Sequence, residues 1–363
     1  MLEQLLLLYP EAHIFTICDF LSDEERRFLK GHVATTSFIQ RMPGARKHYR
    51  HFLPLMPLAV EQLDVSGFEL IISSSHAVAK GVLTGPDQLH VSYVHTPIRY
   101  AWDLQHQYLR ESGLEGGVKG WLARLILHRI RMWDVRTANG VDAFVANSNF
   151  IRRRILKAYR RSAQVIYPPV DVSTFSFSGE KEDFFLTASR LVPYKRVDVI
   201  VEAFRSMPDR KLVVIGDGPE RSKIEKLALG SRNIDILGYQ PTGVLADHMR
   251  RAKAFVFAAE EDFGITPLEA QASGTPVIAF GRGGALETVR GLESDRPTGV
   301  FFSDQTPARV MEAVQLFERE GFAISFEACR DNALSFSSER FKSEFRAFVD
   351  QEWSRFLGQA TTD

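Results

Sequence analysis

Two carboxylates, Glu261 and Glu269, stand on either side of a short turn in the second half of the chain. The turn consists of Phe263, Gly264 and Ile265, and a helical pattern begins directly after it. Backbone N–H groups at the start of a helix have no partner within the helix, so this position favours an anionic group. An anion site bordered by carboxylates suits a ligand with phosphate and hydroxyl groups, such as a nucleotide sugar. The alternative is a capped surface helix whose acids are solvated.

Two cations, Arg190 and Lys195, lie in a loop that follows a predicted strand at 184–188. Arginine offers phosphate oxygens a planar fork, and lysine offers a point charge. If this loop neighbours the turn at 263–265, both cations reach the anion site. A basic loop before a helix is common by itself, so this assignment depends on the phosphate-class site predicted beside it.

His95 and two glycines are weaker candidates. His95 follows a predicted strand at 91–94, where a contact with a sugar hydroxyl or a developing charge and a buried histidine bonded to the backbone are equally consistent. Gly216 and Gly218 lie in the segment VIGDGPE, but Arg221 replaces the third glycine of a dinucleotide-binding fingerprint. A turn that lines a nucleotide base is at least as consistent with this segment as NAD binding.

The elements that position these residues follow from the hydrophobic pattern. Apolar, β-rich runs alternate with helical patterns in two series, which a stiff Pro168-Pro169 segment joins. The pattern predicts an α/β protein with two parallel-sheet domains, residues 1–167 and 168–342, facing across a cleft. Ligands of such sheets bind at the carboxyl ends of the strands. The residues at these ends are His76, His95, Ser189, Arg190, Gly216 and Glu261.

Composition excludes several classes of protein. The 363 residues include 45 Lys+Arg and 45 Asp+Glu, so the chain lacks the basic field of a nucleic-acid binder. Cys18 and Cys329 match no metal-ligand spacing, and they indicate buried thiols in a reducing compartment. No apolar run approaches the ~18 residues that span a bilayer, and the first residues do not form a signal peptide. We therefore expect a cytoplasmic protein. No two aspartates are separated by a single residue, so we expect no metal and no cofactor.

Six segments resemble, in order, the sequence blocks of the retaining glycosyltransferases of family four, which have the GT-B fold of two Rossmann-like domains. The segments are VHTPIRYAWD, ANSNFIRRRI, VIYPPVDVSTF, RLVPYKRVD, VIGDGP and EDFGITPLEAQASGTPVIAF. Together they are most similar to the bacterial mannosyltransferase branch, which builds O-antigen and exopolysaccharide from GDP-mannose. The resemblance also implies that a C-terminal helix, residues 343–363, packs back on the first domain.

The resemblance implies a role for each candidate residue. Arg190 and Lys195 would hold the donor diphosphate, together with the backbone of residues 263–265. Glu269 would bind the ribose hydroxyls, Glu261 the donor sugar, and His95 would face that sugar from the N-terminal domain. The remaining residues would line the nucleotide site near the base: Gly216, Gly218, Pro219, Tyr239 and Gln240.

The resemblance also implies a mechanism and a place in the cell. Transfer retains the anomeric configuration, and the cations stabilise the leaving diphosphate without a metal. The acceptor would be a lipid-linked saccharide, and basic helical patterns at 116–135 and 150–159 would contact the inner face of the cytoplasmic membrane. The family normally opens with a strand and a glycine-rich turn, whereas Met1 stands where the following helix starts. We therefore expect the N-terminal sheet to lack its first, central strand.

The sequence predicts transfer of a hexose, mannose from GDP-mannose, to a lipid-linked saccharide in cell-surface polysaccharide biosynthesis. A second interpretation keeps the fold but uses UDP-glucose or another nucleotide sugar. A third is a catalytically silent protein that binds a sugar nucleotide or a glycan. An NAD-dependent dehydrogenase is a more distant alternative.

Overall fold

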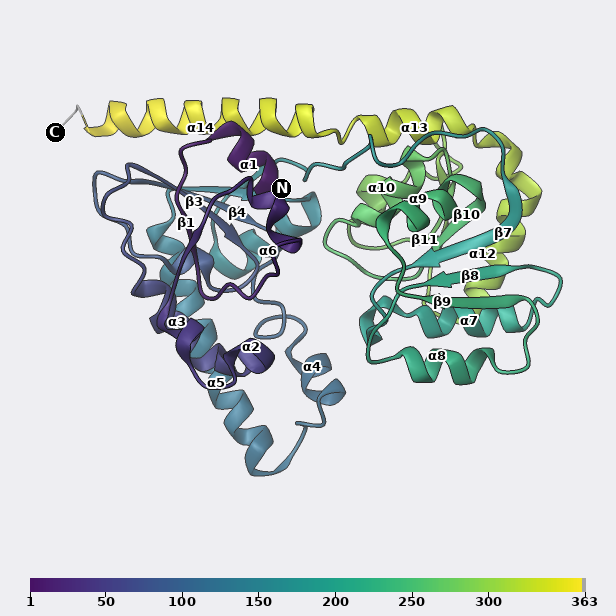
Figure 1. Ribbon diagram of the computed structural model, residues 1–363, viewed down its shortest axis with the longest axis horizontal. Coiled ribbons are helices and arrows are strands. Elements are labelled where there is room, and N and C mark those ends of the chain that lie inside the picture. The colour runs from purple at the N-terminus through teal and green to yellow at the C-terminus, as the bar shows by residue number, and fades with distance from the viewer. Residues whose placement is uncertain (361–363) are drawn as a thin grey trace. The chain divides into compact units, whose positions relative to one another are not determined.

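The computed structural model of the protein describes residues 1–360. By its internal contacts the chain forms two compact units. Unit 1 contains Met1–Pro168 and the chain from Phe341 onward, and unit 2 contains Pro169–Arg340. Residues 361–363 of the C-terminal helix expected at 343–363 lie outside the described part. Each unit is an α/β domain with its own parallel sheet (Figure 1).

The sheet of unit 2 has six parallel strands in the order β12-β11-β10-β7-β8-β9. The strands are β7 (Glu182–Ala188), β8 (Leu212–Ile215), β9 (Ile234–Gly238), β10 (Ala252–Phe257), β11 (Val277–Phe280) and β12 (Gly299–Phe302). From β7 the chain first builds outward through β8 and β9, and then returns to add β10 on the other edge of β7. The topological switch point therefore lies between β7 and β10, where a sheet of this kind binds its ligand.

Helices cover both faces of this sheet, because the central strands are apolar on both sides. One hydrophobic cluster joins the sheet to α7 (Val197–Arg205), α8 (Arg221–Ala228) and α12 (Pro307–Glu320). The cluster on the opposite face takes residues from α9 (Thr242–Arg251), α10 (Ile265–Ala272), α11 (Ala285–Thr288) and α13 (Phe326–Leu334). The sheet is thereby held rigidly between two layers.

Unit 1 contains a four-stranded and a two-stranded parallel sheet. The larger sheet has the order β3 (Leu70–Ser75), β4 (Leu89–Val94), β5 (Ala143–Ala146) and β6 (Gln164–Val165). The smaller sheet pairs β1 (Ile14–Thr16) with β2 (Ala34–Thr36). The helices are α1 (Leu2–Leu8), α2 (Ala45–His48), α3 (Met56–Glu61), α4 (Gln105–Glu111), α5 (Gly117–Thr137), α6 (Asn149–Tyr159) and α14 (Ser338–Ala360).

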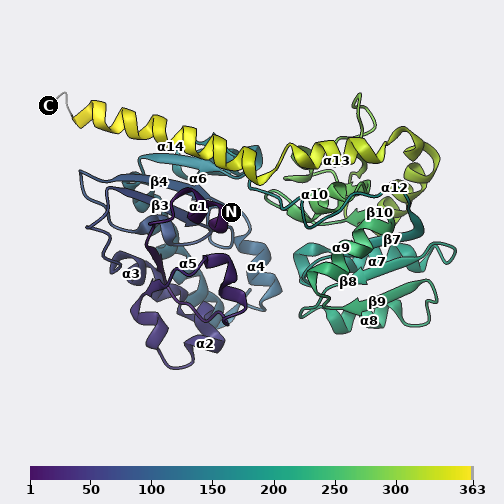
Figure 2. The same ribbon diagram turned by 45° about the horizontal axis from the view of Figure 1, so that its top comes forward.

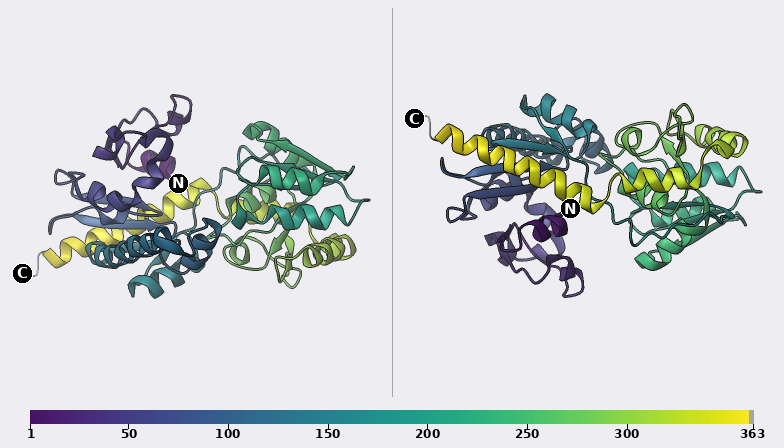
Figure 3. Two further views of the ribbon diagram at one scale, coloured as in Figure 1. Left: turned by 90° about the horizontal axis from the view of Figure 1, so that it is seen from below. Right: turned by 90° about the horizontal axis from the view of Figure 1, so that it is seen from above.

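Helix α14 returns the end of the described chain to unit 1, where it crosses the larger sheet (Figure 3). Phe341 and Phe345 are fully buried, and their rings lie 6.0 Å and 6.2 Å from that of Tyr93 in β4. Val349 continues this buried stripe one turn later, at the spacing of a helix face. Helix α2 lies at the end of unit 1 remote from α14 (Figures 1 and 2).

Helix α5 differs from the expected pattern. The helical spacing of Trp121 with Leu125 and Ile130 predicts one apolar side, yet the Trp121 side chain is 64% exposed, and Val118 is 83% exposed. Ile130, by contrast, is buried. The reason is positional: only the C-terminal half of α5 lies against the body of unit 1, whereas its N-terminal half extends beyond that body (Figure 1). Helical periodicity predicts a face, but it does not show how far the partner surface reaches.

An ion pair between Lys80 and Asp134 lies inside unit 1. The Lys80 ammonium is 2.8 Å from Asp134 Oδ1, and the two side chains are 1% and 0% exposed. The ammonium also donates to the Asp134 carbonyl oxygen and to Thr137 Oγ1. Trp102 Nε1 and the Tyr159 hydroxyl donate to Asp134 Oδ2. The cluster joins α5, α6 and the 3-10 helix η4 (Ala79–Gly81).

Candidate active site

The loops after β7 and β10 meet at the switch point of unit 2. Lys195, at the end of the 3-10 helix η6 (Pro193–Lys195), forms an ion pair with Glu261, which follows β10. The two side chains are 11% and 19% exposed, so the pair is partly shielded from water. The Lys195 ammonium also lies over the rings of Tyr194 and Phe257, at 5.6 Å and 5.8 Å from their centroids. The structure thus brings together two of the residues selected from the sequence.

Arg190 lies in the same loop as Lys195 but in a different environment. Its side chain is exposed and forms no hydrogen bond or ion pair with the described residues. The loop itself is held in place, because Leu191 is buried and its N–H donates to the carbonyl oxygen of Asp217. Arg190 is therefore a cation on a fixed backbone, with its guanidinium open to an anion.

The start of α10 has the properties of an anion site. Gly264 precedes the helix at φ 92°, in the left-handed region that glycine adopts without strain, and it carries no capping side chain. Among the described residues, no acceptor is present for the backbone N–H groups of Gly264, Ile265 and Thr266. Phe263 is buried, with its ring 5.7 Å from that of Phe336, which anchors the turn. These unpaired donors favour a phosphate group.

A second glycine turn, after β11, supports this loop from behind. The Gly284 N–H donates to the carbonyl oxygen of Glu261 at 2.8 Å. A Cβ atom on Gly284 would lie 2.3 Å from the backbone of Phe263, and one on Gly283 would lie 2.4 Å from the carbonyl oxygen of Glu261. No residue larger than glycine fits at either position. The GRGG run that contains these two glycines is a turn signal in the sequence, but the loop that they support becomes evident only in the fold.

Gly216 and Gly218 have a similar supporting role. A Cβ on Gly216 would lie 1.8 Å from the carbonyl oxygen of Ser189, and one on Gly218 would lie 2.4 Å from that of Leu191. The two glycines therefore allow the loop after β8 to pack, backbone to backbone, against the loop that carries Arg190. This contact gives them a structural reason that is separate from their predicted place near the base.

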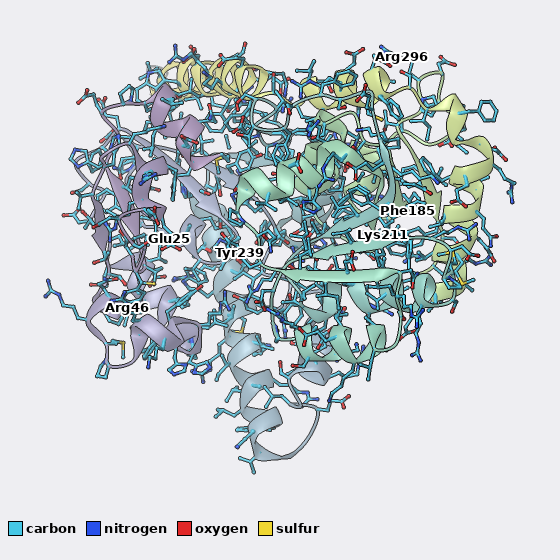
Figure 4. All side chains as sticks on the ribbon, turned by 45° about the vertical axis from the view of Figure 1, so that its right-hand side comes forward. Glu25, Arg46, Phe185, Lys211, Tyr239 and Arg296 are labelled. Carbon is cyan, nitrogen blue, oxygen red and sulfur yellow. The ribbon has the colours of Figure 1, made fainter. Side chains whose placement is uncertain are left out.

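The remaining residues predicted near the base lie at the outer ends of β8 and β9. Pro219 is exposed, and Tyr239 is 75% exposed. Figure 4 labels Tyr239. The Gln240 side chain donates to the carbonyl oxygen of Leu237 at 2.8 Å. The contacts of these residues are within unit 2, and their proximity to a base stays a prediction.

Glu269 lies one turn into α10 and is half-buried. Burial raises the pKa of its carboxyl to about 7, and the negative charge of Asp171 adds to this effect. No hydrogen-bond donor among the described residues reaches this carboxylate. A carboxylate with this environment would be stabilised in its charged form by hydroxyl donors from a ligand.

In unit 1, His95 follows β4 and receives support from both neighbouring strands. Its Nε2 lies 3.0 Å from Ser74 Oγ of β3, and Asn147, after β5, donates to its carbonyl oxygen at 3.0 Å. Burial lowers the pKa of His95 to about 4, and the positive charge of His76 contributes. The imidazole is therefore neutral at pH 7, which suits a hydrogen bond to a hydroxyl better than binding of an anion.

None of the helices within residues 1–360 is long and apolar enough to cross a bilayer. In the same part of the chain, no three His, Cys, Asp or Glu side chains gather as a metal ion would require.

Comparison with known proteins identifies the family. Residues 173–335 match the family described as glycosyl transferases group 1. Residues 11–174 match the one described as glycosyltransferase family 4. The chain belongs to glycosyltransferase family 4. The two matches follow one another along the chain, and they confirm the family expected from the six sequence blocks.

Curated relatives in this family include mannosyltransferases. A GDP-mannose-dependent α-(1-6)-phosphatidylinositol monomannoside mannosyltransferase of Mycobacterium tuberculosis is 31% identical over 229 residues, which cover 54% of this chain and 56% of the relative. A D-inositol 3-phosphate glycosyltransferase of Geodermatophilus obscurus is 31% identical over 230 residues, covering 55% and 50%. The chain thus spans about half the length of the curated relatives it matches.

Solved structures show the same fold. A structure of Anabaena HepE in complex with UDP and glucose matches with a TM-score of 0.68 and 16% identity, covering 96% of this family-4 chain and 94% of HepE. Sucrose-phosphate synthase from Thermosynechococcus elongatus matches with a TM-score of 0.71 and 16% identity, covering 97% and 92%. These matches confirm the expected GT-B fold with two Rossmann-like domains.

Proposed function

We propose that the protein is a retaining glycosyltransferase that transfers mannose from GDP-mannose to a lipid-linked saccharide in cell-surface polysaccharide biosynthesis. The observation that carries the proposal is the convergence of Lys195, Glu261 and the uncapped start of α10 at the switch point of unit 2. Relatives named as GDP-mannose-dependent enzymes support the choice of donor.

The donor diphosphate binds at the cations of unit 2. Glu261 accepts one proton of the Lys195 ammonium, and the other protons are available to phosphate oxygens. Arg190 supplies a second, open cation, and the N–H groups of Gly264 and Ile265 supply a third source of positive potential. Glu269 accepts hydrogen bonds from the ribose hydroxyls. These charges require no resident metal to neutralise the diphosphate.

The chemical step breaks the bond between the anomeric carbon and the diphosphate oxygen. Negative charge then grows on the departing diphosphate, where the two cations and the helix start stabilise it more strongly than they do in the intact donor. The acceptor hydroxyl attacks from the face that the diphosphate leaves, and its proton passes to a phosphate oxygen. The configuration at the anomeric carbon is retained. Glu261 and the neutral His95 contact the transferred sugar.

Contact with the inner face of the cytoplasmic membrane forms part of the proposal, and helix α5 supports it. Val118, Trp121 and Leu122 are exposed beside Lys119 in the part of α5 that extends from unit 1. Apolar side chains flanked by cations bind anionic interfaces. In α6, Ile151, Ile155 and Tyr159 are buried, so only its outer face remains available. Trp121→Ser should reduce sedimentation with anionic vesicles, whereas Phe322→Ser, which removes an even more exposed ring in unit 2, should not.

The proposal is tested by donor choice. The full chain is incubated with radiolabelled GDP-mannose or UDP-glucose and a lipid extract that contains acceptors, and label in the lipid phase is measured. Thermal unfolding is followed in parallel with GDP and with UDP. We expect transfer from GDP-mannose and stabilisation by GDP. Stabilisation by UDP and not by GDP would indicate that the donor is UDP-glucose and not GDP-mannose. Stabilisation by GDP without transfer to any acceptor or water would favour a silent binding protein.

A further inference from the structure

Unit 1 contains a long segment from which acidic residues are absent. Residues 26–60 include no aspartate or glutamate, although the whole chain has equal numbers of acidic and basic residues. Cations concentrate between residues 41 and 51, which we call the basic segment. Its charged and titratable residues are Arg41, Arg46, Lys47, His48, Arg50 and His51. No other ligand assigned above uses them.

The cations of the basic segment are not neutralised by any residue that the structure describes. Arg46, Lys47 and Arg50 are exposed and form no ion pair with any described residue. Arg50 lies over the ring of Tyr49 at 5.4 Å, which orients its guanidinium without cancelling its charge. Outside the segment the pattern differs, because Lys30 is paired with Glu3 at 2.7 Å. The segment therefore keeps a concentrated positive potential. Figure 4 labels Arg46 within it.

The basic segment lies at the carboxyl ends of β3 and β4. It leads into the 3-10 helix η3 (Tyr49–Leu55), whose Leu53 packs against the cluster of Ile98 and Ala101 that follows β4. His76, directly after β3, lies within the electrostatic influence of Arg50 in the basic segment. Desolvation lowers the pKa of His76, and the positive charges of Arg50 and of Arg99 lower it further. This is the end of the sheet at which His95 lies, and at which parallel sheets bind their ligands.

We propose that the basic segment, through Arg46, Lys47 and Arg50, binds a phosphate group carried by the acceptor. The proposal rests on the function proposed above and names the class of acceptor, a phosphorylated or diphosphorylated one. Two arginines and a lysine without partners match the geometry and charge of phosphate oxygens. The donor diphosphate has its own proposed site in unit 2, so the cations of the basic segment are available to bind a second anion. Their place at the end of the sheet where β3 and β4 deliver His76 and His95 favours the acceptor over a general surface charge.

The probe is inorganic pyrophosphate, titrated calorimetrically into the full chain with the unit 2 site saturated by GDP. The variant is Lys47→Gln combined with Arg50→Gln. The matched control is Arg232→Gln, an exposed arginine of unit 2 without an ion pair. We expect pyrophosphate to bind beside GDP, and the double variant to weaken its binding by about tenfold or more, since each lost charge-assisted hydrogen bond is strong. The control should leave binding unchanged.

A second readout follows His76 by NMR, with its signal assigned from a His76→Gln variant. Bound pyrophosphate should raise the pKa of His76, because an anion opposes the effect of Arg50 and Arg99. Arg50→Gln should also raise it in the absence of pyrophosphate. A variant in which the segment is merely unfolded would shift the His76 signal to a different position both with and without pyrophosphate. The two pKa changes therefore separate binding from folding.

Several outcomes would overturn the proposal. One is the absence of pyrophosphate binding once GDP is bound, and another is equal weakening by Arg232→Gln. A third is that the double variant loses sedimentation with vesicles of phosphatidylcholine and phosphatidylglycerol while it keeps pyrophosphate affinity, which would assign the segment to the bilayer surface. Failure of the proposed function is seen separately, as the absence of GDP binding to unit 2. In that case pyrophosphate is titrated into Lys195→Ala, where its binding still reports on the basic segment of unit 1.

Discussion

Two lysine–carboxylate pairs, Lys80–Asp134 in unit 1 and Lys195–Glu261 in unit 2, look alike as contacts and differ in what surrounds them. Both ammonium groups lie near two aromatic rings. The Lys80 ammonium donates two hydrogen bonds, forms an ion pair with Asp134 and is 1% exposed. Among the described residues, the Lys195 ammonium has one carboxylate acceptor, at the ends of two strands next to an uncapped helix.

The difference shows how a structural pair is told from a binding pair. A fully buried pair is out of reach of a ligand, and the removal of one partner leaves an uncompensated charge. A pair with spare donors at the edge of a sheet can exchange water for phosphate at small cost to the fold. Stability should therefore depend on the first pair and catalysis on the second.

The largest effect on folding is expected for Lys80→Ala. The substitution leaves the Asp134 carboxylate buried without its counter-charge, so the free energy of unfolding should fall by about 3–5 kcal/mol. Urea unfolding measured by circular dichroism checks this value. As a control, Lys80→Met with Asp134→Leu removes both charges and should be less destabilised than Lys80→Ala. A loss below about 1 kcal/mol in the single variant would mean that the pair is not structural.

Lys195→Ala should produce the opposite profile. The kcat/KM of the proposed mannose transfer should fall by about 10²–10³-fold, because a cation that stabilises the leaving diphosphate is removed. The free energy of unfolding should fall by less than in Lys80→Ala, since water still reaches both side chains of this pair. Transfer assays and urea unfolding on the same preparation test both statements. An unchanged kcat/KM would show that Lys195 does not act on the donor diphosphate.

Gly284→Ala tests whether the support behind the donor loop matters. The new Cβ would lie 2.3 Å from the Phe263 backbone, so the turn before α10 must shift, at a cost of about 1–3 kcal/mol. GDP affinity should fall with it. Gly243→Ala is the matched control, because a Cβ there meets open space within a helix. Equal behaviour of the two variants in calorimetry would argue against this support.

A smaller effect is expected from pH through Glu269. Its folded pKa of about 7 lies above its ordinary value, so the buried carboxyl costs stability as pH rises from 4.5 to about 7. Ribose hydroxyls donate to the ionised form, so guanosine, which has the ribose but no titrating phosphate, should bind about tenfold more weakly at pH 6 than at pH 8. Calorimetry across this range measures the slope. In Glu269→Gln the slope should vanish, and a persisting slope would assign it to another group.

Local patterns in the sequence predicted much of the fold and part of the site. Strand and helix periods predicted the parallel sheets, and the loop positions of Lys195 and Glu261 predicted their meeting, because strand ends of one sheet lie on one edge. The partnership of Lys80 with Asp134 was not predicted, because only the packed fold brings residues 54 positions apart together. The exposure of Trp121 was missed for the same reason: it depends on where the neighbouring surface stops.

The central claim, that unit 2 holds a diphosphate at Lys195, Arg190 and the start of α10, is tested most directly by one calorimetric comparison. GDP and guanosine are titrated into the native chain and into Lys195→Ala. We expect the native chain to bind GDP about 10²-fold more tightly than guanosine, and Lys195→Ala to lose most of that difference while keeping its affinity for guanosine. Equal loss for both ligands, or no preference for GDP in the native chain, would contradict the account.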